Sequence, residues 1–162
     1  MTNTGSAEQE CLTCRSLTGE ARISPGPPIH TGRYWVIEHA YPCAMRGWLV
    51  LILQRHAEAL HELTAEEWVE FADLQRRTVT LLRQTTGCKK EYLAAFTDKP
   101  GFPHLHIHLV ARSPALPDEL RGGQIFTQLN VGPAEAVRPT DLAAFCAKLA
   151  EAFLGTAEPK KK

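Results

Sequence analysis

The sequence predicts an α+β domain in which a largely antiparallel sheet is covered by one long helix and joined by a C-terminal helix. Two observations lead to this fold class. Short segments rich in apolar, aromatic and β-branched residues are separated by loops that contain Pro or Gly, which is typical of strands. Two longer segments carry apolar residues at helical spacing, so each can bury one face. The chain has 162 residues, which is enough for one domain with its own core.

The first two strands are predicted from adjacent apolar segments. Residues 33–39 (RYWVIEH) are rich in aromatic and β-branched residues, which favour strands. Residues 47–54 (GWLVLILQ) form an almost continuous apolar run, as expected of a strand that is buried on both faces. The loop around Pro42 is short, so we expect the two strands to be antiparallel neighbours. Arg55 and His56 follow the second strand.

The long helix is predicted downstream of residue 64. Thr64 and Glu67 form a capping box, and Gly87 is a natural C-terminal stop. The apolar residues that largely follow helical spacing are Trp68, Phe71, Leu74, Val79 and Leu82. We expect this face to cover the sheet.

A second helix is predicted near the C-terminus, beginning with Thr140 or Asp141 as its cap and ending at Gly155. Its shared apolar face consists of Leu142, Phe145, Leu149 and Phe153. Cys146 falls on the apolar side and is expected to be a core residue.

Two further strands are predicted at residues 91–97 and 104–110, and the second contains three histidines that alternate with aliphatic residues. Because successive side chains of a strand point to opposite faces, His104, His106 and His108 should share one face, each roughly 7 Å from the next. Imidazole gains and loses a proton near neutral pH and can act as a nucleophile or metal ligand. This face is therefore predicted to be functional.

The composition limits the domain organisation and the partners. Lys plus Arg and Asp plus Glu number 18 each, so the overall charge gives no sign of binding to nucleic acid or a membrane surface. No apolar signal segment or bilayer-length run is present, and we expect a cytoplasmic protein. Residues 1–10 are expected to be a disordered tail and residues 156–162 a basic tail. The domain would span residues 11–155, with a core at 11–112 and an extension at 113–155.

The five cysteines are an odd number in a chain without a secretion signal, so a disulfide framework is not expected. Cys11 and Cys14 form a C-x-x-C motif, which can be half of a zinc site or a redox dithiol. No βαβ pattern surrounds the motif, which argues against the redox interpretation. A zinc site would need two more ligands from elsewhere, and His56 is one candidate.

The segment from His104 to Val110 resembles the signature of the histidine triad (HIT) family, His-φ-His-φ-His-φ-φ, where φ is hydrophobic. The C-x-x-C motif, the Arg55-His56 pair, the long helix and the strand that follows it also resemble features of the zinc-bearing bacterial-type members. The likeness covers about residues 11–112. It implies the HIT-like fold, with a sheet of about five strands, and a homodimer.

The resemblance implies a nucleotide hydrolase or nucleotidyltransferase that acts at an α-phosphate, with a dinucleoside polyphosphate or a nucleoside phosphoramidate as substrate. His106 would attack phosphorus and carry the nucleotidyl group until water releases a nucleoside monophosphate. The expected phosphate contacts are His108, Gly101, Phe102 and Arg112. The partner would be a small-molecule nucleotide, with no nucleic acid and no membrane.

The resemblance also implies one structural zinc ion. In the zinc-bearing members the metal is held by the C-x-x-C pair, by the histidine after the second strand and by the first triad histidine. The matching positions are Cys11, Cys14, His56 and His104. Two thiolates and two imidazoles would make a closed tetrahedral site.

Two positions depart from the family pattern. Many members have Ser or Thr three residues before the first triad histidine, where this chain has Gly101. Many also have a histidine after the glycine that opens the second strand, where this chain has Trp48. Two other functions therefore stay open, a metalloenzyme with a catalytic metal on the three strand histidines and a noncatalytic nucleotide-binding or interaction module.

Overall fold

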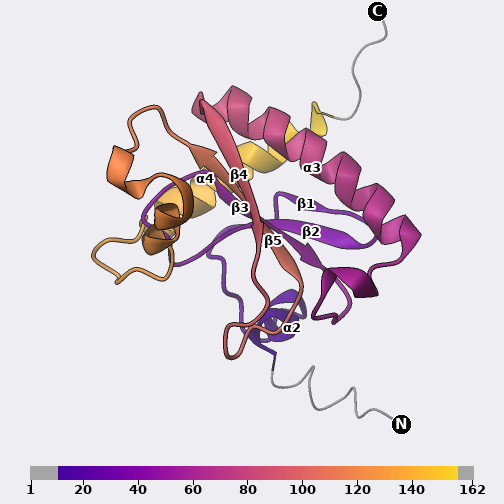
Figure 1. Cartoon of the computed structure of the whole chain (residues 1–162). Helices are drawn as coiled ribbons and strands as arrows, with labels where there is room; N and C mark the ends of the chain where they lie inside the picture. The colour runs from indigo at the N-terminus through magenta and orange to yellow at the C-terminus, as the bar shows by residue number, and fades with distance from the viewer. Residues whose placement is uncertain (1–10, 157–162) are drawn as a thin grey trace, which may run out of the picture.

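In the computed structural model, which describes residues 11–156, five strands form an antiparallel sheet (Figure 1). The order across the sheet is β1-β2-β3-β5-β4, so β5 lies between β3 and the edge strand β4. The strands span His30–Thr31 (β1), Trp35–His39 (β2), Trp48–Leu53 (β3), Lys90–Ala95 (β4) and His106–Arg112 (β5). The predicted fold class and sheet are confirmed. The predicted N-terminal tail and residues 157–162 lie outside the described residues.

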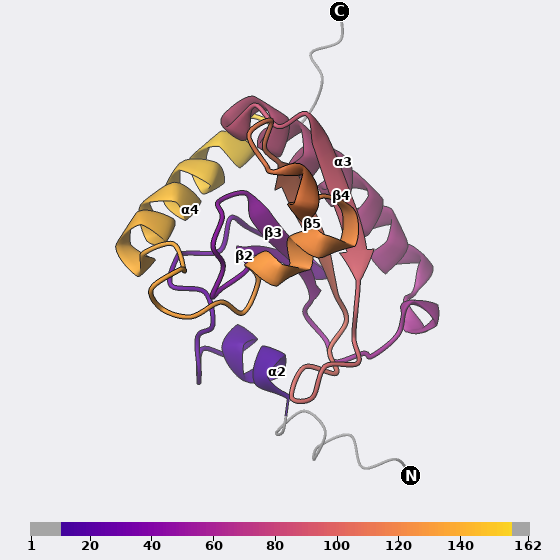
Figure 2. The ribbon, with the colours of Figure 1, turned by 60° about the vertical axis from the view of Figure 1, so that its left-hand side comes forward.

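The helices lie on both sides of this sheet. Among residues 11–156, the α-helices span Leu12–Leu17 (α2), Ala65–Thr86 (α3) and Pro139–Leu154 (α4). The 3-10 helices of the same part of the chain span Leu60–Glu62 (η1), Asp118–Leu120 (η2) and Gly122–Gln128 (η3). Figure 2 shows the segment with η2 and η3 in front of the sheet and α3 behind it. The extension after β5 therefore covers the sheet face that α3 leaves open.

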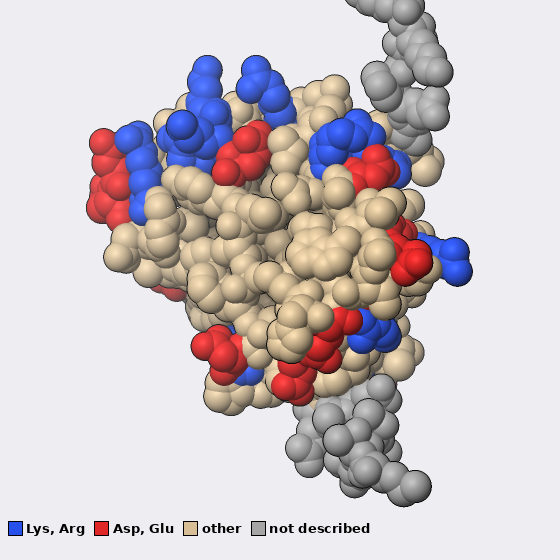
Figure 3. All heavy atoms as spheres, turned by 45° about the vertical axis from the view of Figure 1, so that its right-hand side comes forward, with Lys and Arg blue, Asp and Glu red and all other residues tan. Residues whose placement is uncertain are grey.

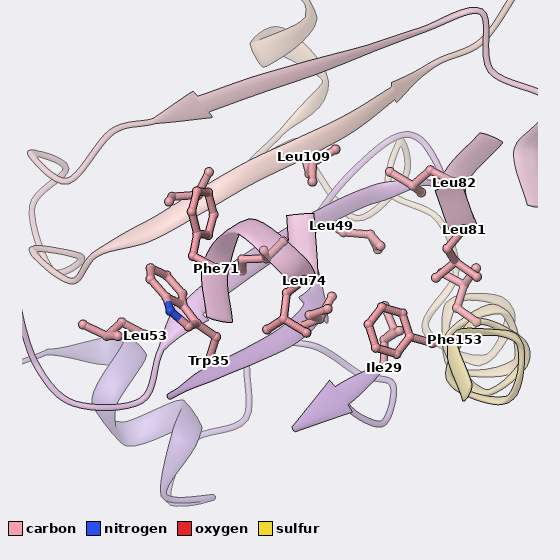
Figure 4. Packing of buried hydrophobic residues seen from close by; sticks show 14 of the residues in the cluster. Ile29, Trp35, Leu49, Leu53, Phe71, Leu74, Leu81, Leu82, Leu109 and Phe153 are labelled. Carbon is pink, nitrogen blue, oxygen red and sulfur yellow. The ribbon is translucent and has the colours of Figure 1, made fainter. Parts of the chain in front are cut away.

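The main core lies between the sheet and α3. Phe71 and Leu74 of α3 pack with Leu49 of β3 and Leu109 of β5, and all four side chains are buried (Figure 4). Phe153 of α4 belongs to the same cluster. A second cluster covers the opposite face and contains Trp48, Val50, Ile52, Val110 and Ile125. Alternate residues of β3 enter the two clusters, which explains its continuous apolar run.

Helix α3 begins with the predicted capping box. The Thr64 hydroxyl accepts a hydrogen bond from the Glu67 N–H at 3.3 Å, and the Glu67 carboxylate accepts one from the Thr64 N–H at 2.8 Å. Gly87 ends the helix with φ +64°, a left-handed conformation that favours glycine. The prediction is wrong for Trp68, which is 41% exposed. The neighbouring Glu67 is buried instead of Trp68, because the Glu67 carboxylate accepts two hydrogen bonds from Arg55.

Helix α4 begins earlier than predicted. Arg138 is its N-cap and Pro139 occupies the first turn, so Thr140 and Asp141 lie inside the helix and do not cap it. Proline is favoured at the first helical position because its missing N–H would have no partner there. The buried residues are Leu142, Cys146, Leu149 and Phe153, with Phe145 partly buried, so the predicted apolar face is confirmed.

Strand β5 begins at His106, two residues later than predicted, and runs to Arg112. His104 lies in the preceding segment, where its ring is within 2.6 Å of the Leu53 carbonyl. His106 and His108 face away from α3, while Ile107 belongs to the core cluster beneath it. The predicted alternation of faces is therefore confirmed within the strand. Within residues 11–156, no helix combines the length and apolarity needed to cross a bilayer.

Candidate functional site

The first part of the site is a cluster of two cysteines and two histidines. Cys11 caps the N-terminus of α2 and Cys14 lies in its first turn, so both thiols face the same side. The Cys14 sulfur lies 3.3 Å from Nδ1 of His56 and 3.3 Å from Nδ1 of His104. The Cys11 sulfur lies 3.7 Å from Nδ1 of His104. All four potential ligand atoms lie within 4.8 Å of one another.

These distances and donors are compatible with zinc. Tetrahedral zinc holds its sulfur and nitrogen ligands about 3.5 Å apart. Nε2 of His104 lies 2.6 Å from the Leu53 carbonyl, and Nε2 of His56 lies 3.3 Å from Glu58 Oε1. Because these oxygens accept hydrogen bonds, the proton of each neutral ring lies on Nε2. The unprotonated Nδ1, whose lone pair can bind a metal, faces the thiols. Burial lowers the pKa of His104 to about 4, so its ring is neutral as a ligand must be.

Carboxylates and backbone contacts hold the segments that carry these ligands. Arg55, beside His56, donates to Glu67 at 2.7 and 2.8 Å and to the Glu62 carbonyl at 2.7 Å. The N–H of Leu12 donates to the Gly101 carbonyl at 3.1 Å, which ties α2 to the loop before His104. These contacts bring three segments that are distant in sequence to one point.

Gly101 has a structural role in this arrangement. Its φ is +80°, and a Cβ there would lie 3.2 Å from Leu12. A side chain at this position would therefore be strained and would press on α2. Gly101 does not line the cavity described below, whereas the neighbouring Phe102 does.

The second part of the site is a cavity of about 220 Å³ on the sheet face that is opposite α3. It crosses the sheet from Glu38 on β2, over Val50 and Ile52 on β3, to His106 and His108 on β5. Phe126 of η3 also lines it, so the extension after β5 forms part of the wall. The floor is mainly apolar, with the two histidines exposed to the cavity from one strand.

His106 carries its free lone pair on Nε2. Its Nδ1 lies 2.7 Å from the His104 carbonyl. A carbonyl can only accept, so Nδ1 carries the proton and Nε2 is unprotonated. Burial, more than any other effect, lowers the pKa of His106 and favours the neutral ring. A neutral imidazole whose other nitrogen is oriented in this way is a suitable nucleophile.

His108 has the opposite tautomer. The Trp48 indole N–H donates to Nδ1 of His108 at 3.0 Å, so the proton of a neutral His108 ring lies on Nε2. Burial, followed by the nearby His106, lowers the pKa of His108 to about 3. The His106 and His108 rings lie 4.9 Å apart. The cavity therefore has one nitrogen lone pair and one N–H donor side by side.

The three triad imidazoles do not converge on one point. Both ring nitrogens of His104 have neighbours in the cysteine cluster or at Leu53, and Nδ1 of His106 is bonded to backbone. Within residues 11–156, the one group of three or more potential metal ligands is the Cys11–Cys14–His56–His104 cluster. This geometry argues against a catalytic metal held by the three strand histidines.

Arg112, which the resemblance suggested as a phosphate contact, does not line the cavity. It lies four residues beyond His108 along an extended strand, roughly 13 Å further on. Its Nε is buried and has no hydrogen-bond partner among the described residues. The structure thus separates Arg112 from the two cavity histidines.

Sequence reasoning missed two charged residues of the cavity. Glu38 is 3% exposed, and its carboxylate accepts a 2.6 Å hydrogen bond from Arg22. An acid directly after the apolar residues 35–37 of a predicted strand was the signal that could have identified it. Lys99 lies on the loop before β5, and its Nζ donates to Asn130 Oδ1 at 2.9 Å. Nothing in the local pattern marks Lys99, because Asn130 is distant in sequence.

Among the comparisons with known proteins, those with solved structures match this architecture. No family model matches the chain, and no curated protein sequence matches it. A hypothetical histidine triad nucleotide-binding protein of Sulfolobus tokodaii is 15% identical, with a TM-score of 0.66 over 94% of this chain and 99% of that one. A zinc-bound histidine triad family protein of Mycobacterium smegmatis is 19% identical, with a TM-score of 0.59 over 90% of this chain and 99% of that one.

A third similar structure is an enzyme. The diadenosine triphosphate hydrolase of Plasmodium falciparum is 11% identical, with a TM-score of 0.60 over 79% of this chain and 76% of that one. At these identities the likeness is one of fold. The chain has the histidine triad fold.

Proposed function

We propose that this protein is a histidine triad nucleotide hydrolase or nucleotidyltransferase that acts at an α-phosphate, with a dinucleoside polyphosphate or a nucleoside phosphoramidate as substrate. One observation carries the proposal. His106 and His108 face one cavity with opposite tautomers, one with a lone pair and the other with an N–H on Nε2. A phosphoryl centre needs both an attacking lone pair and a donor to its oxygens.

In the first step, Nε2 of His106 would attack phosphorus, and the bond to the leaving group would break with its electron pair on the leaving atom. The ring would become positive, and the His104 carbonyl at Nδ1 would stabilise that charge. The Nε2–H of His108 would donate a hydrogen bond to a nonbridging oxygen and keep its proton. Water would then attack phosphorus, the P–N bond would break, and a nucleoside monophosphate would leave.

The proposed metal is one structural zinc ion on Cys11, Cys14, His56 and His104. Bound there, zinc would supply a closed four-ligand crosslink between α2 and the two segments that carry His56 and His104. Zinc on the His104 ring would help to fix the same residue whose carbonyl orients His106. The zinc site would therefore position the nucleophile through one residue.

The other end of the cavity supports a nucleotide ligand. The Glu38 carboxylate is suited to accept hydrogen bonds from sugar hydroxyls, and Val50 and Ile52 offer an apolar floor. Cys11, Cys43, Cys88 and Cys146 form no disulfide bond, which fits a reducing compartment and supports a cytoplasmic location.

We also propose a homodimer, formed by antiparallel pairing of two copies along β4. This strand is the edge of the sheet, and Leu93 on it is 50% exposed. An exposed apolar edge strand is a ready template for another strand. On the face shown in Figure 3, acidic and basic side chains surround a broad uncharged area.

The mechanism is tested with His106→Ala and, as a control, His61→Ala, which changes an exposed histidine on η1. We expect His106→Ala to lose nearly all turnover of diadenosine tetraphosphate and adenosine phosphoramidate while keeping its fold, because the α3-facing side of β5 is unchanged. Rapid quenching of the wild type with a substrate labelled at the α-phosphorus should trap an acid-labile, base-stable label. Full activity in His106→Ala would refute the assignment, and nucleotide binding without turnover would favour a binding module.

A further inference from the structure

Lys99 lies on the loop between β4 and β5 and lines the same cavity as His106. Its Nζ donates to Asn130 Oδ1 at 2.9 Å and lies 5.1 Å from the centroid of the Phe102 ring. The ammonium is thus held between this loop and the extension after η3. Among the described lining residues, Lys99 is the one Lys or Arg.

The strand order places His106 between two different ends of the cavity. On one side lie β3 and then β2, where Glu38 is in register with His108 through Val50, roughly 10 Å from His108 because neighbouring strands are about 4.8 Å apart, and further from His106. On the other side lies β4, followed by Phe96 and Lys99. A ligand with its reacting phosphorus at His106 therefore meets a carboxylate in one direction and an ammonium in the other.

We infer that Lys99 binds the negatively charged leaving group beyond the α-phosphate, so that nucleoside phosphoanhydrides such as dinucleoside polyphosphates are preferred over nucleoside phosphoramidates with an uncharged leaving amine. The inference rests on the proposed function and narrows its substrate class. Lysine is a common phosphate ligand that acts as a point charge. At the opposite end the Glu38 carboxylate is paired with Arg22, which does not line the cavity, so that end presents hydrogen-bond acceptors and no cation to a polyphosphate.

The chemistry of the first step explains the preference. When the phosphoanhydride P–O bond breaks, its electron pair and negative charge move to the leaving phosphate oxygen, and a nearby ammonium stabilises that charge. A phosphoramidate must instead gain a proton on nitrogen to leave as an amine, and a cation gives no such stabilisation.

The kinetic test compares kcat/KM for diadenosine tetraphosphate and for adenosine phosphoramidate, whose leaving group is ammonia. We expect Lys99→Met to lower the value for the tetraphosphate by about tenfold or more and to leave that for the phosphoramidate within about threefold. Lys99→Arg should restore part of the loss. The matched control is Lys90→Met, which removes an exposed lysine at the far end of β4. Equal losses on both substrates, or none, would overturn the inference.

A binding test separates this inference from the proposed function. The affinities of AMP and ADP are measured by calorimetry in His106→Ala, with and without Lys99→Met. We expect ADP to bind about tenfold more tightly than AMP and expect Lys99→Met to abolish that difference. If the wild type turns over neither substrate, the proposed function fails, but this ratio still decides the role of Lys99. A ratio that Lys99→Met leaves unchanged, or no binding of either nucleotide, would overturn the inference.

Discussion

The Trp48 indole N–H donates a buried 3.0 Å hydrogen bond to Nδ1 of His108. Trp48 occupies the position where many proteins with this motif have a histidine. Phe126 packs edge-on against both rings, with centroids 5.0 Å from Trp48 and 5.4 Å from His108. The extension after β5 thus supports the tryptophan, and together they fix the tautomer of His108. Trp48 therefore orients His108 at a position where this chain departs from the family pattern.

We expect Trp48→Phe to lower kcat by about tenfold, because the Nδ1 acceptor of His108 loses its partner and its Nε2 proton is no longer fixed. Imidazole nitrogen chemical shifts in the NMR spectrum should show a mixture of His108 tautomers. The matched control is Trp35→Phe. It also removes a buried indole hydrogen bond, which Trp35 donates to the Glu67 carbonyl at 2.9 Å, but Trp35 lies in the core between the sheet and α3. It should lower the free energy of unfolding while leaving kcat nearly unchanged. Equal effects on kcat would contradict the role of Trp48.

Metal analysis should find about one zinc ion per chain in protein purified under reducing conditions without chelators. Cys14→Ser should lower zinc content and thermal stability together, since metal binding is coupled to folding. Cys146→Ser is the control because Cys146 is a buried thiol of α4 outside the cluster. It should change stability without changing zinc content. Zinc-free wild type with unchanged stability would refute the metal site.

Local patterns predicted those features that depend on residues close in sequence. The alternation at residues 104–110 indicated the faces of β5, and Thr64 and Glu67 indicated the start of α3. The position of Trp68 could not be predicted in this way. It turns outward because Glu67 is held inside by Arg55, from the loop after β3, and that ion pair depends on the tertiary fold.

For the same reason, the sequence pointed to some residues of the candidate site and not to others. The motif resemblance identified the four zinc-ligand candidates and the two cavity histidines, and the structure brings each set together. It did not identify Glu38 or Lys99, because their roles depend on strand order and on contacts with Arg22 and Asn130. It also suggested Arg112, which shares the face of His108 but lies too far along the strand.

The proposed dimer predicts that Leu93→Lys will dissociate the protein into monomers in sedimentation experiments. A charge on the edge strand opposes pairing with a second copy, and Leu93 does not line the cavity. Val69→Lys is the control, because Val69 is 72% exposed on α3, away from the edge strand. A wild-type protein that sediments as a monomer at high concentration would contradict the dimer.

His39 should make folding stability sensitive to acid. Its Nδ1 donates to the Ala40 carbonyl at 2.7 Å, and its Nε2 accepts from the backbone N–H groups of Gly47 and Trp48 at 3.1 and 3.3 Å. A proton on Nε2 would face these two donors. Phe145 of α4 packs at 6.1 Å and brings no compensating carboxylate. Burial accordingly lowers the pKa of His39 to about 4.

The unfolded chain, with a histidine pKa of about 6.5, binds this proton more readily than the folded protein does. The free energy of unfolding should therefore be unaffected by His39 above about pH 6.5 and should fall as the pH falls toward 4, by up to about 1.4 kcal/mol per pH unit. His39→Gln cannot take up a proton in this range. Urea unfolding at a series of pH values should show a steeper acid loss in the wild type than in His39→Gln. Parallel pH profiles for the two proteins would mean that folding does not lower the pKa of His39.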